Sequence, residues 1–254
     1  MLFISVLLLS FFTNYLVAFV FHQGPSEAIE APENCCEGRP CFCCGCNVRY
    51  NKSDEKRYFC GDERLGPAEL PTMLPLGTFV AGYDRFGNKS PHEFLEEWWN
   101  TTLKEDGTEV GWRYPDMNGF GLDQDGIPIK ANVDLEVGTL VDRFGNASGR
   151  FISPAAAPFS QRALHPQNLN TDSDMKFPNN YHVYNVTRSF TVFAGPIKPW
   201  FGQPGFGVQF FLGVGVRVED HIGMKNLQPL DSSKLPRQGP PLCHRGENAA
   251  GEEL

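Results

Sequence analysis

The chain has 254 residues and a formal net charge of −8, from 22 basic and 30 acidic side chains. An acidic chain without a basic run is a poor candidate for binding polymeric nucleic acid or an anionic membrane surface, so we exclude both as partners. Abundant glycine (26 residues), proline (20) and phenylalanine (21) favour short strands and long ordered loops over a helix bundle.

The first 22 residues contain no Asp, Glu, Lys or Arg and carry two apolar runs, at residues 2–12 and 15–21. This pattern predicts a secretory signal peptide over residues 1–20, with cleavage near residues 18–21. A membrane anchor is the alternative, but Ser10, Thr13 and Asn14 interrupt the apolar stretch. We therefore expect a secreted, extracellular protein with no membrane attachment once the signal is removed.

Eight cysteines support export, and six of them crowd into residues 35–46. An even number of cysteines behind a signal sequence predicts disulfides. The rival interpretation is a zinc site, because Cys41, Cys43, Cys44 and Cys46 lie close together in the sequence, but the second pair of ligands usual for such sites is absent. The remaining two cysteines are Cys60 and Cys243, and the spacing does not reveal which cysteines pair.

Five Asn-X-Ser/Thr triplets predict glycosylation of an exported chain, at Asn51, Asn88, Asn100, Asn146 and Asn185. Asn88 is the poorest acceptor among them because a proline follows its serine directly.

Residues 21–130 form a cysteine-rich N-terminal region with one clear helix candidate, at residues 91–104. Ser90 can cap this helix, Pro91 suits its first turn, and Glu93 completes a capping box. Trp98 and Trp99 recur at helical spacing and are expected to pack in the core. Residues 105–132 contain several turn dipeptides and are predicted to be loop-rich.

The pattern becomes strand-like from residue 133. Candidate strands cover residues 132–141, 151–152, 181–186, 190–193 and 208–218, and two glycines break the last run. They predict an α+β fold class rich in β-structure, with curved, mostly antiparallel sheets and a small helical, disulfide-clasped N-terminal region. Residues 228–254 are polar and rich in proline and glycine, which predicts a flexible C-terminal tail.

Residues 139–162 hold the most informative motif. The sequence Asp-Arg-Phe-Gly-Asn at residues 142–146 also occurs at residues 84–88, but the flanks barely agree, which indicates reuse of a turn. In the second copy Arg143 and Phe144 are followed by Phe151 and Arg162. Forked guanidinium donors and aromatic faces suit a ligand with two phosphates and flat rings. The alternative is a surface hairpin with solvated arginines.

Further segments follow this motif in a fixed order: Gly-Arg-Phe at residues 149–151, Ser-Gln-Arg-Ala-Leu at 160–164, Tyr-His-Val-Tyr at 181–184, and Pro-Trp-Phe-Gly-Gln-Pro-Gly-Phe-Gly-Val-Gln-Phe at 199–210. Together they resemble the tuberculosis necrotizing toxin (TNT) domain family, in its secreted fungal NAD glycohydrolase branch. Residues 60–67 and the helix over residues 94–99 look like the N-terminal thumb of that branch. The resemblance implies curved sheets of the TNT type, with a catalytic domain over residues 131–227.

The resemblance implies hydrolysis of NAD+ or NADP+ to nicotinamide and ADP-ribose or its phosphate, with no cofactor required for catalysis. Carried over, Arg143 and Gln209 are the catalytic residues, and Arg143 also holds the phosphates. Phe144 lines the nucleotide, Phe151 lies at the nicotinamide end, and Arg162 is a second phosphate contact.

The implied chemistry agrees with these residue types. Nicotinamide is already a cationic leaving group, so its bond to ribose can break toward an oxocarbenium ion without an acid. A neutral amide such as Gln209 can then orient ribose hydroxyls or water. Glycosidases instead use paired carboxylates, and no carboxylate stands out in these motifs.

Several further expectations rest on one or two residues each. His182 is a secondary substrate-binding candidate, although a histidine in a Tyr-rich strand is more often structural. Glu219 and Asp220, at the end of the long apolar run, are candidates for a structural calcium, which is associated with fungal members of the family. A homodimer completes the expected partners.

Two other function classes stay open. An ADP-ribosyltransferase on a similar scaffold would need an acceptor-directing glutamate, for which Glu219 is the only nearby candidate. A non-catalytic, cysteine-rich secreted effector is the other. A glycan on Asn146 would also crowd the pocket mouth, three residues after Arg143, unless the turn points it away.

Overall fold

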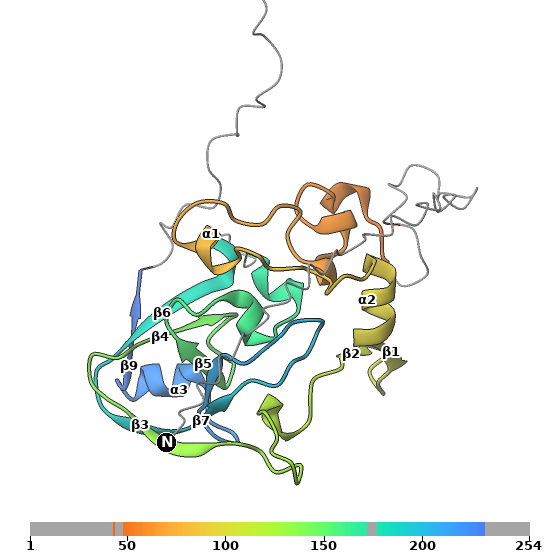
Figure 1. Cartoon of the computed structure of the whole chain (residues 1–254). Coiled ribbons are helices and arrows are strands. Elements are labelled where there is room, and N and C mark those ends of the chain that lie inside the picture. Colours follow the sequence, from red (N-terminus) through yellow and green to blue (C-terminus); the bar gives the residue numbers. More distant parts are fainter. Residues whose placement is uncertain (1–42, 44–47, 172–176, 232–254) are drawn as a thin grey trace, which may run out of the picture. The chain divides into compact units, whose positions relative to one another are not determined.

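The computed structural model describes Cys43 and residues 48–171 and 177–231 (Figure 1). The predicted signal peptide, six of the eight cysteines and nearly all of the predicted tail lie outside the described residues. Within the described part of the chain, no helix has the length and apolar character needed to cross a membrane.

The secondary structure consists of short elements joined by long loops, as the composition predicts. The helices are α1 (Leu76–Phe79), α2 (Pro91–Trp98) and α3 (Val218–Gly223). The strands are β1 (Trp99–Leu103), β2 (Glu109–Trp112), β3 (Ala131–Leu135), β4 (Leu140–Phe144), β5 (Phe151–Pro154), β6 (Tyr181–Val186), β7 (Phe190–Pro196), β8 (Val208–Phe211) and β9 (Leu227–Leu230). Several single 3-10 turns lie between them, including Met117–Gly119, Phe159–Arg162 and Pro166–Leu169.

Seven strands form one sheet in the order β3-β7-β8-β5-β4-β6-β9, and every pairing in it is antiparallel. Strands β1 and β2 form a separate antiparallel hairpin. The strand-rich, antiparallel fold with few helices confirms the predicted fold class. Central strands β4 and β5 contribute only two register pairs to each other, Val141 with Pro154 and Asp142 with Ser153. The pairing between these two strands is therefore short, and the Ala155 amide extends it by donating to the Leu140 carbonyl at 3.1 Å.

Apolar side chains lie on both faces of β4, because residues at odd separations on a strand point in opposite directions. Val141 packs with Ile152, Tyr184 and Val218 in one core cluster. Phe144 packs instead with Phe159 in a second cluster, which also holds residues of α1. The polar residues between these two positions, Asp142 and Arg143, are thereby held at the centre of the sheet.

The N-terminal region has a hydrophobic core of its own. Cys43 and Cys60 form a disulfide with a Cα–Cα distance of 5.4 Å, inside a cluster that also contains Phe94 and Phe201. This confirms the predicted disulfide-clasped N-terminal region for one pair. It also removes Cys43 from the four thiols that the rival zinc interpretation needs, because a disulfide sulfur is not a thiolate ligand.

Helix α2 begins as predicted but ends earlier. Ser90 and Glu93 form the capping box, with Ser90 N donating to Glu93 Oε2 at 2.8 Å and Glu93 N donating to Ser90 Oγ at 3.3 Å. The predicted helix over residues 91–104 is wrong after Trp98, because residues 99–103 are extended and pair with β2. Trp99 contacts Trp112 edge-to-face, with ring centroids 5.0 Å apart, so tertiary pairing overrides the helical period. Both tryptophans pack against the N-terminal core, as expected.

Three other predicted boundaries are corrected. The strand predicted over residues 132–141 is two strands, β3 and β4, and the loop-rich stretch 105–132 contains β2. The long run 208–218 is strand only to Phe211, because Gly213 and Gly215 have positive φ values of 121° and 77° and turn the chain. Hydrophobicity alone does not separate one long strand from two elements joined by a glycine turn.

Candidate active site

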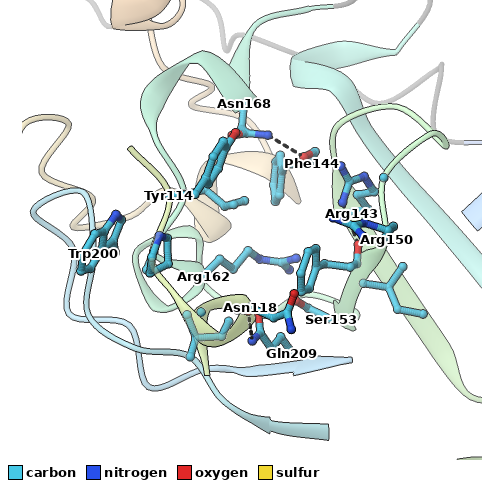
Figure 2. Close-up of a pocket in the computed structure, with 18 of the residues that line it drawn as sticks. Tyr114, Asn118, Arg143, Phe144, Arg150, Ser153, Arg162, Asn168, Trp200 and Gln209 are labelled. Carbon is cyan, nitrogen blue, oxygen red and sulfur yellow. Dashed lines mark hydrogen bonds between the residues drawn. The ribbon is translucent and has the colours of Figure 1, made fainter. Parts of the chain in front are cut away.

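A cavity of about 490 Å³ opens between the N-terminal region and the middle of the sheet. Three separate parts of the chain line it: residues 114–119, residues 142–168 and residues 197–209. Figure 2 shows Arg143, Arg162 and Gln209 around this cavity with Tyr114 and Trp200 on its other side. A segment from outside the predicted catalytic region therefore builds one wall.

Five of the predicted site residues line this cavity: Arg143, Phe144, Phe151, Arg162 and Gln209. They come from β4, β5, β8 and the turn after β5, and are brought together although they span 67 positions of the sequence. His182, Glu219 and Asp220 do not line it. His182 faces Arg143 across the β4–β6 ladder, but its Nε2 bonds to Asn180 Oδ1 at 2.9 Å and its ring contacts Phe177.

Arg143 is held in place by backbone carbonyls. Its Nε donates to the Asn146 carbonyl at 2.9 Å, and its Nη1 donates to the Phe151 carbonyl at 2.8 Å. Gly149 allows this approach, because a Cβ there would lie 2.0 Å from Nη2. Within the described residues Arg143 has no acidic partner at ion-pair distance, and burial lowers the pKa of its guanidinium. The turn thus fixes a cation at the cavity without neutralising it.

Arg162 has different surroundings. It pairs bidentately with Asp142, at 2.5 Å from Nη1 to Oδ1 and 2.9 Å from Nη2 to Oδ2, and it also donates to the Ala157 carbonyl. Both side chains are almost wholly buried. The charge of Arg162 is therefore already compensated, whereas the sequence analysis expects it to meet a phosphate. That role stays a prediction.

Asp142 is a site residue that the sequence analysis misses. Its carboxylate also accepts hydrogen bonds from Tyr181 Oη and the Ala156 amide, each at 2.9 Å. Burial, and after it the charge of Asp142 and the hydrogen bond to it, raise the pKa of the Tyr181 hydroxyl. One signal was available: Asp142 precedes Arg143 in the repeated motif, and a carboxylate inside an apolar strand needs a buried partner.

Two further positively charged side chains line the cavity. Arg150 and Lys198 line it beside Arg143 and Arg162, and Asp142 is the only carboxylate of the described residues that does so. The lining therefore carries a surplus of three positive charges, in a chain whose net charge is −8. Such a local reversal of sign attracts small anionic ligands.

The aromatic wall formed by Tyr114, His165 and Trp112 was not predicted from the sequence. Tyr114 lines the cavity and hydrogen-bonds through its hydroxyl to Nε2 of His165, at 2.9 Å. The His165 ring stacks on Trp112, with centroids 4.1 Å apart and an interplanar angle of 12°. Burial lowers the pKa of His165 to about 3, so this imidazole is neutral at physiological pH. Tyr114 itself keeps 62% of its surface exposed.

Gln209 lies on β8 and is buried, with 8% of its surface exposed. Its amide nitrogen donates to the Asn118 carbonyl at 2.9 Å, drawn as the dashed line between these two labelled residues in Figure 2. Its amide oxygen has no hydrogen-bond partner within the described part of the chain. A neutral amide with a free acceptor thus lies in the same cavity as the unpaired Arg143.

The predicted sequon at Asn146 does not obstruct this arrangement. Asn146 is exposed and does not line the cavity. Its side-chain oxygen accepts hydrogen bonds from Ser148, at 3.2 Å from the amide and 2.5 Å from the hydroxyl. The turn therefore presents the backbone carbonyl of Asn146 to Arg143 and its side chain to solvent.

Glu219 and Asp220 are placed differently from the prediction. They lie in the first turn of α3 and not at the end of a strand. Asp220 Oδ2 accepts a hydrogen bond from the Arg217 amide at 2.8 Å, and Glu219 pairs with the Arg217 guanidinium at 3.0 Å. No group of three or more His, Cys, Asp or Glu side chains suited to a metal occurs among the described residues. Calcium usually takes six to eight oxygen ligands, of which these two side chains could supply only a part, and the calcium assignment stays a prediction.

Residues 134–230 match the family model described as Tuberculosis necrotizing toxin. Over these residues the chain is similar to the TNT family. The match covers strands β4 to β9, and so includes Arg143, Phe144, Phe151, Arg162 and Gln209. Tyr114 and Asn118 lie outside it.

A curated relative is the conidial surface nicotinamide adenine dinucleotide glycohydrolase nadA of Aspergillus fumigatus (strain ATCC MYA-4609 / CBS 101355 / FGSC A1100 / Af293). It is 50% identical over 153 residues, which is 60% of this chain and 63% of that protein. The matched region thus spans less than two thirds of the relative's length.

Two solved structures are also similar to the chain. Tuberculosis necrotizing toxin complexed with its immunity factor is 19% identical, with a TM-score of 0.44 over 59% of this chain and 80% of that one. Rhs1-CT in complex with its cognate immunity protein is 19% identical, with a TM-score of 0.29 over 46% and 84%.

Proposed function

We propose that this protein is a secreted NAD(P)+ glycohydrolase, which cleaves the bond between nicotinamide and ribose. One observation carries the proposal: an unpaired guanidinium and a neutral amide with a free acceptor lie in one positively charged, aromatic-lined cavity. The TNT domain and the name of the 50% identical relative support the same activity.

The charge of the cavity suits a dinucleotide. Its two bridging phosphates carry two negative charges, and Arg143 offers them a preorganised fork of donors. Arg150 and Lys198 add cations that no acidic side chain of the described residues neutralises at ion-pair distance. The rings of Phe151 and Tyr114 offer faces and edges for the two bases, whereas the Phe144 ring is buried beneath the lining.

The reaction needs little from the protein beyond orientation. The C1′–N bond breaks, and its electron pair neutralises the pyridinium nitrogen of the departing nicotinamide. Water then adds to C1′ and loses one proton, which gives ADP-ribose. Gln209 supplies a fixed dipole beside this centre, and an amide cannot trap the cation as a stable ester in the way a carboxylate can. We propose that no cofactor takes part.

The two alternative functions are less well supported. A transferase would need a glutamate at the cleft, and Glu219 is outside the cavity lining. A non-catalytic effector would not explain why an unpaired cation is held at the cavity, since such a group is costly to bury without a ligand.

The remaining expectations are proposals of the same kind. Secretion is supported by the uncharged, apolar first 22 residues and by the relative's name, which places that protein on the conidial surface. Glycosylation, a homodimer and calcium have no support among the described contacts. Intact mass before and after deglycosylation, light scattering in solution, and turnover with and without a chelator test them in turn.

The decisive experiment incubates the purified, secreted protein with NAD+ and with NADP+ and follows free nicotinamide. We expect release without labelling of the protein, whereas labelled protein would indicate a transferase and no turnover an effector. Arg143→Ala and Gln209→Ala should each lower turnover by on the order of 100-fold or more while the protein stays folded. A near wild-type rate in either variant would remove that residue from the mechanism.

A further inference from the structure

We propose that the backbone carbonyl of Asn118 is a positioning group for Gln209, which fixes the direction in which the glutamine amide acts. The carbonyl holds the amide nitrogen, so the amide oxygen faces the cavity as a hydrogen-bond acceptor. This inference rests on the proposed function and adds to it the polarity of the catalytic amide.

The hydrogen bond admits only one orientation of the side chain. A carbonyl oxygen has no proton to donate, so the group of Gln209 that lies 2.9 Å from Asn118 O must be the NH2 group. The Oε1 atom is then directed elsewhere, and within the described residues nothing donates to it. An acceptor at this place can bind an O–H of a ribose hydroxyl or of the attacking water.

The loop that carries the carbonyl has an unusual backbone. Met117, Asn118 and Gly119 are consecutive residues with positive φ values of 53°, 58° and 73°. Residues other than glycine rarely adopt this left-handed region, and they persist in it only where the surroundings hold them. Two of these three residues carry a Cβ, so contacts with the rest of the protein must hold them in this conformation.

Both ends of the loop are anchored. Arg113 donates from Nη1 to the carbonyls of Glu96 and Glu97 at 2.8 and 2.6 Å, at the end of α2 where helical carbonyls lack partners. Trp200 Nε1 donates to the Arg113 carbonyl at 2.7 Å. At the other end, the Lys198 amide donates to the Gly119 carbonyl at 2.9 Å. The strained turn is therefore held from two sides.

The loop lies outside the TNT domain, which begins at residue 134. The acceptor that orients Gln209 thus comes from the N-terminal region, 91 positions before it in the chain. The N-terminal region accordingly contributes to the active site, because its Asn118 carbonyl orients the Gln209 amide.

The first test replaces Gln209 with glutamate and measures turnover against pH. An ionised carboxylate has no donor for the Asn118 carbonyl and would be repelled by it, whereas a protonated carboxyl again offers one donor and one acceptor. The neighbours that line the cavity, Arg143, Arg150, Arg162, Lys198, Asp142 and Tyr114, are the same in both proteins. Dividing the kcat of Gln209→Glu by that of the wild type at each pH removes their contribution.

At about pH 8, where the introduced carboxyl is ionised, we expect this ratio to be on the order of 0.1 or lower, and we expect it to rise as the pH is lowered and the carboxyl takes up its proton. A ratio near or above one at about pH 8 would overturn the inference, because a carboxylate that cannot donate to the Asn118 carbonyl would then serve as well as the amide. Absence of the wild-type activity would instead overturn the proposed function.

The second test leaves Gln209 unchanged and disturbs the turn. In Gly119→Ala the new Cβ would lie 3.3 Å from Pro115 Cγ and 4.0 Å from Gln209 Nε2, at a positive φ. Gly126→Ala is the matched control, since Gly126 has a φ of 78° and no neighbour within 4 Å. We expect kcat to fall by about fivefold or more in Gly119→Ala, with KM within about twofold of wild type, and both constants to stay within about twofold in the control. Equal kcat values in the two variants, with thermal unfolding showing both folded, would overturn the inference.

Discussion

Arg143 and Arg162 line the same cavity, but their partners differ, and so should the results of replacing them. Arg143 donates to two backbone carbonyls and has no acidic partner among the described residues. Arg162 neutralises Asp142, whose carboxylate is fully buried. A substitution at Arg162 therefore leaves a buried charge behind, and one at Arg143 does not.

This difference predicts the free energy of unfolding of the two alanine variants. Arg162→Ala should destabilise the protein by about 3–5 kcal/mol, because an unpaired buried carboxylate is costly. Arg143→Ala should cost only about 2 kcal/mol or less, from two lost hydrogen bonds. Urea titration of both variants measures the difference. If Arg162→Ala were the more stable of the two, the pair with Asp142 would not have the energetic role assigned to it.

A second prediction at this scale concerns His165. Its folded-state pKa of about 3 lies below the value of about 6.5 in an unfolded chain, so below pH 6.5 the unfolded state binds a proton that the folded state does not. Stability should therefore fall with falling pH between these two values, by up to about 1.4 kcal/mol per pH unit.

The variant His165→Phe tests this prediction, because phenylalanine can still stack on Trp112 and does not titrate. Its unfolding free energy should depend on pH less steeply than that of the wild type between about pH 6 and pH 4. Parallel curves for the two proteins would show that protonation of His165 is not linked to unfolding.

Among the elements, the turn between β4 and β5 is the one that shapes the site. The sequence Asp-Arg-Phe-Gly-Asn occurs at residues 84–88 and again at 142–146, but the two copies make different contacts. In the first copy, Asp84 accepts hydrogen bonds from the amides of Phe86 and Asn88, and Arg85 donates to the carbonyls of Leu65 and Pro67. In the second copy the aspartate is buried against an arginine, and the turn arginine faces the cavity. Equal local sequence thus gives a structural turn in one place and a candidate binding turn in the other.

The close approach of Gly149 to Arg143 leads to a prediction at the scale of this turn. In Gly149→Ala the Cβ would lie 2.0 Å from Nη2 and 2.1 Å from Cζ, so the guanidinium must move. Because the end of a flexible side chain can yield, stability should change little, whereas kcat/KM should fall by on the order of 10- to 100-fold.

Gly223→Ala provides the control for this variant, because Gly223 has no neighbouring atom within 4 Å. Steady-state kinetics and thermal melting of both proteins separate an effect on Arg143 from an effect of the methyl group itself. Unchanged kcat/KM in Gly149→Ala would mean that the position of Arg143 is not important for turnover.

For the molecule as a whole, the cavity depends on two hydrophobic cores. The N-terminal core contains the Cys43–Cys60 disulfide and also Phe201, which lines the cavity. Trp112 of that region donates from Nε1 to Gln167 at 2.6 Å, and Tyr114 bonds to His165. Loosening the N-terminal core should therefore affect the wall of the cavity that faces strands β4 to β8.

We predict that the double variant Cys43→Ser/Cys60→Ser is destabilised by about 3 kcal/mol, because the disulfide closes a loop with a sequence separation of 17 residues. Chemical denaturation measures this loss, and turnover at a temperature near the new midpoint should fall with it. Unaltered stability would indicate that the packing of this core, and not the covalent link, holds the N-terminal region.

The strand-rich fold class, the start of α2 and five residues of the cavity could be predicted from sequence, because capping and periodicity are local and the ordered motifs resemble a known family. The end of α2 could not, since pairing with β2 is decided by contacts between Trp99 and Trp112. Asp142, Tyr114 and the Asn118 carbonyl were missed for the same reason. Their roles come from neighbours distant in the chain, and burial, charge pairing and hydrogen-bond direction exist only once the chain has folded.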